Sequence, residues 1–317
     1  MSSEPAEKSQ AVHGRETIIV RNVKKFFGPT RALDGVNFTA RAGEIHAVVG
    51  GNGCGKSTIL SMTAGLYQPT VGDVLVSGET VTGPNQHVGF MLQKDLLLPW
   101  RSIVHNIEFG LESRGVAREE RRAIAMKELK HCHLDGFEGH YPYQLSGGMR
   151  QRAALARTLA IDPEIILLDE PFSALDPLIR DRLQDELLDL QASLNRTIIF
   201  VSHDLDEAAK IGSRIAIMDG GRVIQLGTPQ EIVRKPANDY VADFVGHMNP
   251  LNVLRARDIM SACDRTPVPE GAVTCRSVTP LRDVIKLKRQ SETDILVAED
   301  GRVLGRIGED ELLDSMI

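Results

Sequence analysis

A glycine-rich stretch that ends in lysine and serine holds the residue types best suited to chemistry in this 317-residue sequence. Residues 50–57 read GGNGCGKS and fit the pattern G-x-x-x-x-G-K-[ST], between a β-branched run and a helix-like segment. Glycines allow successive backbone N–H groups to point at phosphate oxygens, and the following helix N-terminus adds partial positive charge. Lys56 is expected to reach the β- and γ-phosphates of a nucleotide, and the Ser57 hydroxyl to bind Mg²⁺. The predicted nucleotide-binding residues of this loop are Gly50, Asn52, Gly53, Cys54, Gly55, Lys56, Ser57 and Thr58.

Two adjacent carboxylates, Asp169 and Glu170, directly follow the apolar run at residues 165–168. The end of a buried strand is where open α/β sheets place their ligand chemistry. Asp169 is expected to hold Mg²⁺ through water, and Glu170 to accept a proton from an attacking water molecule. A solvated turn would also explain two neighbouring acids, but not the phosphate-binding pattern upstream. The two motifs together predict hydrolysis of a nucleoside triphosphate.

A sheet and its helices must bring these residues together. Short apolar or β-branched runs at 17–20, 43–49, 165–168 and 197–201 predict strands, and the last two lack alternation, as strands buried in a parallel sheet do. Residues 116–134 have helical spacing, so a mainly helical insert is expected over about residues 94–145. Residues 214–226 predict a β-hairpin that turns at Gly220-Gly221, and Pro229 is expected to begin a short helix. The predicted fold class is α/β, a P-loop NTPase core with a helical insert and antiparallel β elements.

The composition limits the partners and compartments that are expected. Lys and Arg number 37 against 43 Asp and Glu, so the formal net charge is -6 and no nucleic-acid partner is expected. The longest apolar runs cover only a few residues, whereas a membrane-spanning helix needs about 20. Residues 1–16 are polar and lack the features of a signal peptide, so we expect a disordered tail and a chain that stays in the cytoplasm. The cysteines have no metal-type spacing, which favours reduced thiols.

A third motif identifies the family that the sequence resembles. Residues 145–149 read LSGGM and precede RQR and an alanine-rich helix, whose N-terminal N–H groups and Ser146 hydroxyl can bind a phosphate. LSGG[QM] is the signature of the ATPase subunits of ABC transporters, which the chain resembles over about residues 17–244. The resemblance implies ATP as the nucleotide. It also implies a head-to-tail dimer with a second copy or a related ATPase subunit, in which Ser146, Gly147 and Gly148 contact the γ-phosphate held by the partner.

The other motifs of this family occur in the expected order along the chain. Gln93 resembles the Q-loop glutamine, residues 173–176 resemble the D-loop with Asp176, and His203 resembles the switch histidine. Phe27 resembles the aromatic residue that stacks on adenine, and Phe26 is a competing candidate. The resemblance assigns catalysis to Glu170, His203, Lys56 and Gln93, and Mg²⁺ binding to Ser57, Gln93 and Asp169. Each residue alone has an ordinary structural explanation, and their joint order and spacing favour the functional one.

The residues after Gln93 resemble one branch of the family. Residues 94–100 read KDLLLPW and Asn106 follows, which is similar to the ATPases of nitrate, sulfonate, taurine and bicarbonate importers. The resemblance implies separate integral membrane permease subunits, a solute-binding protein, and a peripheral subunit at the cytoplasmic face of the inner membrane that powers uptake of a small anion. Trp100, the only tryptophan, is either an anchor for a partner or a packed residue of the helical insert. No residue of this chain is expected to contact the solute, so its identity rests on analogy.

The C-terminal residues resemble a single CBS repeat, a small α/β domain. The resemblance rests on DIM at 258–260, VTPL at 278–281, ILV at 295–297 and GRVLGRI at 301–307. Gly308 and Glu311 stand where a Thr and an Asp commonly hold the ribose of a nucleotide, so a dimer contact is favoured over nucleotide sensing. The expected domains are an ABC ATPase domain at 17–246, a linker at 247–256 and a CBS-like domain at 257–317.

Two other functions compete with that of an import ATPase. A soluble ABC-type ATPase not coupled to transport would need a long coiled-coil insert or two fused ATPase halves, and the sequence predicts neither. A regulatory module that senses adenine nucleotides through the tail would not explain an intact set of hydrolytic residues. Whether the dimer joins two copies of this chain or two different subunits stays open.

Overall fold

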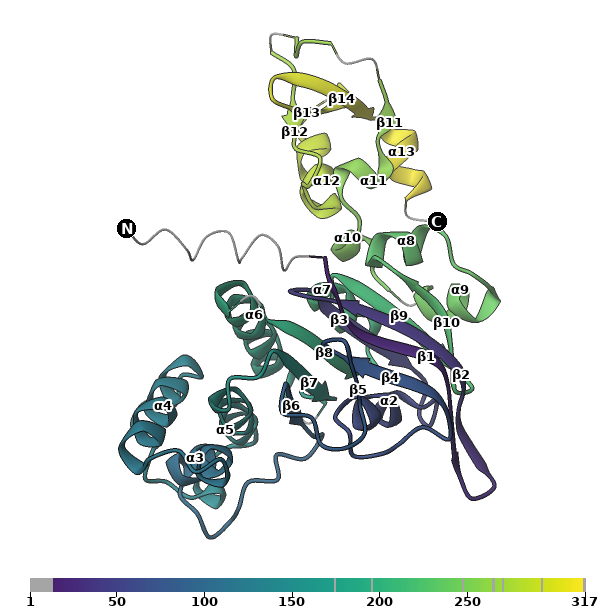
Figure 1. Ribbon diagram of the computed structural model, residues 1–317. Helices are drawn as coiled ribbons and strands as arrows, with labels where there is room; N and C mark the ends of the chain where they lie inside the picture. Colours follow the sequence, from purple (N-terminus) through teal and green to yellow (C-terminus); the bar gives the residue numbers. More distant parts are fainter. Residues whose placement is uncertain are drawn as a thin grey trace, which may run out of the picture. The chain divides into compact units, whose positions relative to one another are not determined.

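The computed structural model describes residues 14–173, 175–194, 196–246, 248–263, 266–269, 271–291 and 293–315 (Figure 1). Most of the tail predicted at 1–16, Ala174 of the D-loop and His247 of the predicted linker lie outside the described residues. Two compact units make up the chain. One comprises Met1–Asp204 with Ile211–Leu226, and the other comprises Leu205–Lys210 with Gly227–Ile317.

A six-stranded sheet with the order β10-β9-β3-β8-β7-β6 forms the centre of the first unit. Its strands are β3 (Ile45–Gly50), β6 (Val88–Met91), β7 (Ile165–Asp169), β8 (Thr197–Ser202), β9 (Arg214–Asp219) and β10 (Arg222–Gly227). Every residue of β3, β7 and β8 is buried, which explains the unbroken apolar runs at 165–168 in β7 and 198–201 in β8. The predicted hairpin is confirmed as β9 and β10, and Gly220 and Gly221 between them both have positive φ, as tight hairpin turns require.

The register of the parallel strands places three functional segments at one edge of this sheet. β3 pairs with β8 so that Val49 lies opposite Ser202, and β7 pairs with β8 so that Asp169 lies opposite Val201. The carboxyl ends of the three strands therefore meet. The glycine-rich loop, Glu170 and His203 begin side by side at this edge.

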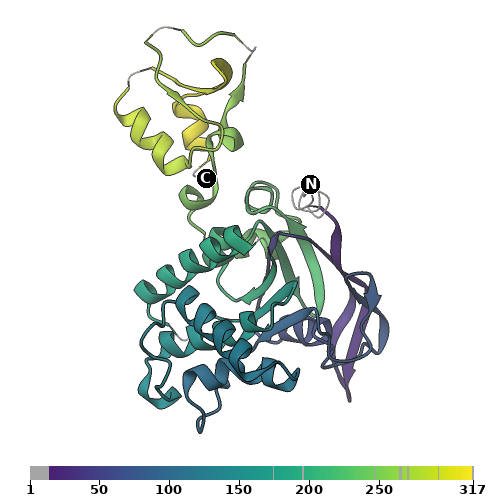
Figure 2. The same cartoon turned by 60° about the vertical axis from the view of Figure 1, so that its left-hand side comes forward.

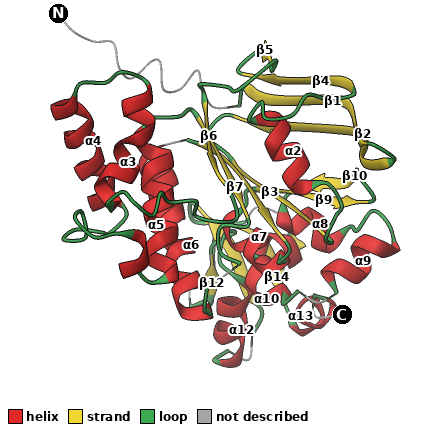
Figure 3. Cartoon of the chain, turned by 90° about the horizontal axis from the view of Figure 1, so that it is seen from below, coloured by secondary structure: helices red, strands yellow, loops and turns green. Residues whose placement is uncertain are grey.

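Helices cover this core and build the predicted helical insert. They are α2 (Lys56–Thr63), α3 (Ile103–Ser113), α4 (Arg118–His131), the 3₁₀ turn η1 (Pro142–Gln144), α5 (Gly147–Ala160) and α6 (Pro177–Leu194). Helices α3 and α4 lie within the sequence range predicted for the insert, and both contact α5. Figures 1, 2 and 3 show these three helices grouped together, away from the strands β1, β2 and β4. No helix in the described part of the chain is long and apolar enough to cross a membrane.

A second, antiparallel sheet packs on the core with the order β2-β1-β4-β5. Its strands are β1 (Glu16–Phe27), β2 (Thr30–Arg41), β4 (Val71–Val76) and β5 (Glu79–Thr80). One buried cluster joins Ile18 of β1, Leu60 of α2 and Leu167 of β7. Helix α2 is therefore held by apolar contacts in the same core as both sheets, which fixes the helix that follows the glycine-rich loop.

The second unit contains a small mixed sheet with the order β11-β14-β13-β12. Its strands are β11 (Ser261–Ala262), β12 (Thr274–Cys275), β13 (Ile295–Glu299) and β14 (Arg302–Ile307). The helices are α7 (Leu205–Ile211), α8 (Pro229–Arg234), α9 (Asp239–Val245), α10 (Pro250–Val253), α11 (Ala256–Ile259), α12 (Leu281–Arg289) and α13 (Glu309–Asp314). Val284, Ile295 and Ile307 belong to a separate apolar core in this unit. The small C-terminal α/β fold is thus present, while its likeness to a CBS repeat and the domain boundaries stay predictions.

Candidate functional site

The glycine-rich loop adopts a shape that only glycine allows at two positions. Gly50 ends β3 with φ 149°, and a Cβ atom there would lie 2.2 Å from the carbonyl oxygen of Met218. Gly55 caps α2 with φ 103°, and a Cβ atom there would lie 2.7 Å from the carbonyl oxygen of Ala32. Side chains are therefore excluded where the backbone turns into the helix. The backbone N–H groups at the N-terminus of α2 are suited to an anion.

Lys56, the first residue of α2, is buried and turns back onto this loop. Its Nζ atom donates to the carbonyl oxygens of Gly50 at 2.7 Å and Gly51 at 2.9 Å. A lysine ammonium is a compact charge on a flexible stem with three donors, so it can exchange these carbonyls for phosphate oxygens. The positive charge thus lies at the predicted phosphate position.

Ser57 and Asp169 form the predicted metal-binding pair. The Ser57 hydroxyl donates to Oδ1 of Asp169 at 2.9 Å, which joins the first turn of α2 to the end of β7. Burial raises the pKa of Asp169, and the hydrogen bond from Ser57 opposes that effect. Mg²⁺ prefers a few protein oxygen ligands together with phosphate oxygens and water. A hydroxyl and a carboxylate beside a phosphate-binding loop fit this ion.

Two of the other predicted catalytic residues lie close to one carboxylate oxygen of Glu170. Gln93 donates through Nε2 to Oε2 of Glu170 at 2.8 Å, and Nδ1 of His203 lies 3.8 Å from the same atom. The Glu170 side chain is mostly shielded from solvent, whereas that of His203 is more than half exposed. Glu170 also has a positive φ of 47°, a strained conformation that tends to occur at functional sites. The structure brings Gln93, Glu170 and His203 together beside the Ser57–Asp169 pair.

The predicted signature residues lie on a different part of the same unit. Ser146 caps α5, since its hydroxyl accepts from the Met149 N–H at 3.4 Å. Gly147 and Gly148 form the first turn of that helix. Helix α5 stands apart from α2 in Figures 1 and 3, so one chain does not bring its signature to its own loop. Asp176 likewise caps α6, accepting from the Ile179 N–H at 3.1 Å.

Phe27, the predicted adenine-stacking aromatic, packs with Lys25 and Tyr67, which the sequence analysis did not identify. The ring of Phe27 meets that of Tyr67 edge to face at 5.5 Å, and the Lys25 ammonium lies 5.1 Å from the Phe27 ring centre. Phe26 is 40% exposed and Phe27 is 42% exposed, so exposure does not separate the two candidates. The only sequence signal for Tyr67 is its place in the loop shortly after α2.

The position of Cys54 next to the N-terminus of α2 leaves two alternatives open, a small residue that fills the loop and an accessible thiol that reacts readily. A thiol near a helix N-terminus can have a lowered pKa and react readily. In the structure Cys54 is 5% exposed, and burial raises the pKa of its thiol despite the nearby Lys56 ammonium. The reading of Cys54 as an accessible, reactive thiol is therefore wrong, and its side chain packs in the core beneath the loop.

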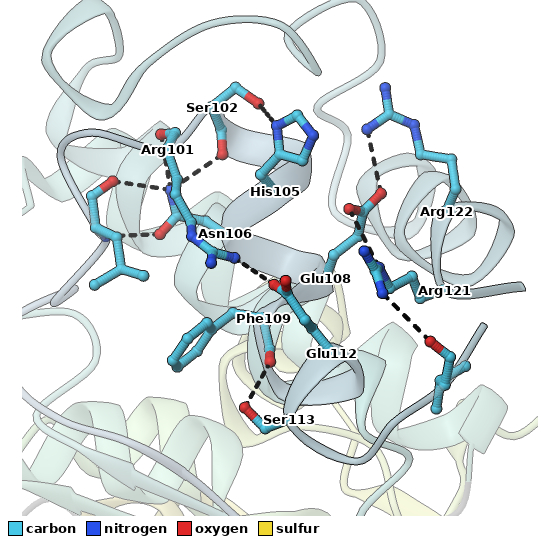
Figure 4. Close-up of polar contacts among 12 residues, drawn as sticks. Arg101, Ser102, His105, Asn106, Glu108, Phe109, Glu112, Ser113, Arg121 and Arg122 are labelled. Atoms are coloured by element: carbon cyan, nitrogen blue, oxygen red, sulfur yellow. Dashed lines mark hydrogen bonds and ion pairs between the residues drawn. The ribbon is translucent and has the colours of Figure 1, made fainter. Parts of the chain in front are cut away.

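Trp100 is exposed rather than packed inside the helical insert. Its side chain is 72% exposed, which excludes the packed alternative. The turn that carries it is held by Asn106, whose amide accepts from the Leu98 N–H at 2.6 Å and donates to the Leu98 carbonyl at 3.1 Å (Figure 4). Asn106 also donates to the carbonyls of Arg101 and Ser102. The exposed tryptophan thus sits on a rigid turn.

Comparison with known proteins assigns this geometry to a family. Residues 33–173 match the sequence profile of the family described as ABC transporter. An uncharacterised ABC transporter ATP-binding protein of Methanocaldococcus jannaschii, MJ0412, is 44% identical over 262 residues, which cover 78% of this chain and 97% of that protein. The chain belongs to the ABC transporter ATP-binding family. The cassette also resembles the glycine betaine/proline betaine transport protein ProV of Escherichia coli, with 41% identity over 281 residues covering 85% of this chain and 69% of ProV.

The relatives of this ABC subunit are named for several solutes. The glycine betaine transport protein OpuAA of Bacillus subtilis is 43% identical over 260 residues, which cover 79% of this chain and 62% of OpuAA. The ABC subunit thus spans less than two thirds of that relative. OpuAA and ProV are both named for glycine betaine transport. They are not importers of the nitrate or sulfonate type, which is the branch that residues 94–100 suggest. Among solved structures, the ATP-binding cassette MJ0796, described as a dimer in a post-hydrolysis state with ADP and Pi, superposes with a TM-score of 0.61 at 32% identity, covering 67% of this chain and 98% of MJ0796.

Proposed function

We propose that this subunit hydrolyses ATP to power import of a small solute, as one half of a nucleotide-sandwich dimer. The observation that carries the proposal is the carboxylate of Glu170, hydrogen-bonded by Gln93 and close to His203, beside the Ser57–Asp169 pair. A positioned carboxylate at the same sheet edge as a phosphate-binding loop is suited to accept a proton from water.

Each group of site residues has a separate role in the proposed hydrolysis of ATP. Backbone N–H groups of the glycine-rich loop and Lys56 bind the phosphates, and Ser57 with Asp169 would hold Mg²⁺. When bound, Mg²⁺ balances charge on the β- and γ-phosphates. Glu170 takes a proton from the attacking water at its carboxylate, and Gln93 keeps that carboxylate in place. His203 supplies a further contact on the γ-phosphate side, so catalysis consists of positioning and charge stabilisation.

The nucleotide site is completed by a partner subunit. Helix α5 begins at Gly147 with Ser146 as its cap, so its first N–H groups and a hydroxyl are available at one helix end. An anion is stabilised at such an end, and the γ-phosphate of the partner fits it. MJ0796 is described as a dimer, which supports the same assembly here. The partner is a second copy or a related ATPase subunit.

The imported solute is glycine betaine or a similar quaternary ammonium compound in this proposal. The alignment to ProV covers 85% of the chain, more than the ATPase domain predicted at 17–246, and so extends into the C-terminal residues. The second candidate is an anion, favoured by residues 94–100 and by the sulfate/thiosulfate importer CysA of Bradyrhizobium diazoefficiens, 44% identical over 244 residues. Either solute requires permease subunits, a solute-binding protein and a peripheral place at the cytoplasmic face of the inner membrane.

The tail is proposed to be a dimer contact rather than a nucleotide sensor. The carboxylate of Glu311 accepts from the Gly308 N–H at 2.8 Å and from the Ser261 hydroxyl at 2.5 Å. The hydrogen bond from Ser261 holds the pKa of Glu311 below its usual range. Glu311 is thus engaged in capping α13, and Gly308 has no side chain to offer a ribose.

Reconstitution tests the transport proposal. The subunit is purified with the membrane proteins that copurify with it, placed in liposomes, and assayed for ATP hydrolysis and solute uptake with glycine betaine, sulfate, nitrate or taurine. Glycine betaine is expected to stimulate both activities several-fold. Stimulation by an anion alone would favour the second candidate, and absence of any membrane partner would contradict transport.

A further inference from the structure

The segment that follows Gln93 contains a strained residue. Leu96 has a φ of 45°, a region that few residues other than glycine adopt, and its side chain is 53% exposed. An apolar side chain that is more than half exposed gains only part of the burial that could offset this strain. Strained backbone of this kind persists only when the surroundings hold it, and it tends to occur at functional positions. The contacts that hold Leu96 therefore bear on function.

Two arginines of α5 supply these contacts. Arg157 donates through one nitrogen to the Leu96 carbonyl at 2.7 Å and through the other to the Asp95 carbonyl at 2.6 Å. Arg150 donates to the Asp95 carboxylate at 3.0 Å, and that carboxylate also accepts from the Leu97 N–H at 3.1 Å. The arginines are seven residues apart, about two helical turns, so they lie on one face of α5. The Asp95–Leu97 segment is fastened to this face.

The same helix reaches Gln93 itself. Gln151 is buried and donates through Nε2 to the Gln93 carbonyl at 3.4 Å. The Gln93 side chain in turn donates to Glu170 at 2.8 Å. Helix α5 thus holds the segment from Gln93 to Leu96 through Arg150, Gln151 and Arg157. This segment positions the Gln93 amide, which donates to the Glu170 carboxylate.

We propose that Arg157 is a positioning residue for ATP hydrolysis. By holding the carbonyls of Asp95 and Leu96 on α5, it sets where Gln93 meets Glu170. A planar guanidinium matches two adjacent carbonyl acceptors, which the single ammonium of lysine does not. The inference rests on the proposed ATPase function. A merely structural arginine would affect stability and leave the rate per folded molecule unchanged.

The test measures kcat and KM for Mg-ATP in Arg157→Ala and Arg157→Lys. Arg157→Ala is expected to lower kcat by about 10-fold to 100-fold, the effect of misplacing a catalytic group by about 1 Å, with KM within about threefold of wild type. Arg157→Lys should fall between wild type and Arg157→Ala. Arg152→Ala is the matched control, because Arg152 lies on the same helix but pairs with Glu186 at 2.8 Å, and its kcat should stay within about twofold of wild type.

A double-mutant cycle separates positioning from stability. If Arg157 acts through Gln93, Arg157→Ala should cost less than about twofold in kcat in a Gln93→Ala background, because residues that act as a unit are not additive. Additive losses would overturn the proposal, as would a kcat for Arg157→Ala within twofold of wild type.

Arg157→Lys keeps the test decisive should Arg157→Ala fail to fold, because lysine retains the charge and the length of the side chain but lacks the planar pair of donors that matches the two carbonyls. It is expected to lower kcat about threefold to 10-fold with KM little changed, and a wild-type kcat would overturn the proposal. Glu170→Gln distinguishes failure of the positioning role from failure of the proposed ATPase function. If it slows hydrolysis and these variants do not, the positioning role alone is wrong; if wild type shows no hydrolysis, the proposed function is wrong.

Discussion

Glu170 and Asp169 are adjacent in the sequence but have different partners, and the backbone between them explains why. Asp169 ends β7 and accepts from Ser57, whereas Glu170 turns away with a positive φ and accepts from Gln93. The Glu170 N–H donates to the Val201 carbonyl at 3.1 Å, which fastens the turn to β8. Asp169 is therefore placed to serve the proposed Mg²⁺ site, and Glu170 the proposed position of the attacking water.

Asp169→Asn tests how much the buried charge of Asp169, a proposed Mg²⁺ ligand, destabilises the fold. Since burial raises the pKa of Asp169 in the folded chain, its ionised form destabilises the fold at neutral pH. Below the ordinary aspartate pKa, about 4, the residue is protonated in both states and the cost is lost. Without Mg²⁺ and nucleotide, Asp169→Asn should therefore raise the thermal unfolding midpoint at pH 8, and the gain should shrink as the pH falls toward 4.

Asp73 on β4 offers a matched control for this prediction. Its side chain is exposed, so Asp73→Asn removes the same charge without relieving burial. If Asp169→Asn does not raise the unfolding midpoint at pH 8, or if the increase grows as the pH falls, burial of the Asp169 charge does not destabilise the fold.

At the scale of elements, some parts of this cassette could be predicted and others could not. The buried strands β7 and β8 were predictable because a strand covered on both faces needs an unbroken apolar run. The two-residue strands β11 and β12 are too short to have a periodic pattern. The glycine-rich loop was predictable because its chemistry lies in consecutive residues, whereas the contacts of Arg157 with carbonyls about 60 positions away leave no spacing in the sequence.

Asn106→Ala tests how the helical insert holds its exposed turn. Asn106 is 0% exposed and makes the four hydrogen bonds drawn in Figure 4. The carbonyls of Leu98 and Ser102 keep a second backbone donor without it, whereas the part-buried Leu98 N–H and Arg101 carbonyl lose the partner that Asn106 provides. We expect a loss of about 2–3 kcal/mol in the free energy of unfolding. Urea unfolding followed by far-ultraviolet circular dichroism measures this loss.

Ser113→Ala serves as the control on the same helix. Its hydroxyl donates to the Phe109 carbonyl at 3.0 Å on an exposed surface, so the change should cost less than about 0.5 kcal/mol. An equal effect of the two variants would show that Asn106 has no special role in the turn.

At the scale of the whole molecule, the predicted catalytic residues Lys56, Gln93, Glu170 and His203 all lie in the first unit. The second unit has its own apolar core around Val284 and Val297. Separate cores allow one unit to be changed without unfolding the other. The role of the C-terminal residues can therefore be tested without altering the nucleotide site.

Deletion of residues 251–317 should leave hydrolysis intact at high protein concentration. If the tail strengthens the dimer, specific activity should fall at low concentration more than in wild type, as mass action requires. Activity measured across a dilution series checks this, and Val297→Asp, which places a charge in the tail core, should have the same effect. A response to AMP that is lost at every protein concentration would instead support nucleotide sensing.

Glu170→Gln examined with Mg-ATP tests the composite ATP site most directly. Glutamine keeps an oxygen for Gln93 but accepts no proton from water, so hydrolysis should slow by about 10²–10⁴-fold while ATP remains bound. Analytical ultracentrifugation should then show a dimer with Mg-ATP, a monomer without nucleotide, and no dimer when Ser146→Arg is added. A protein that stays monomeric with Mg-ATP, or turns over ATP at nearly the wild-type rate, would contradict the proposed composite site.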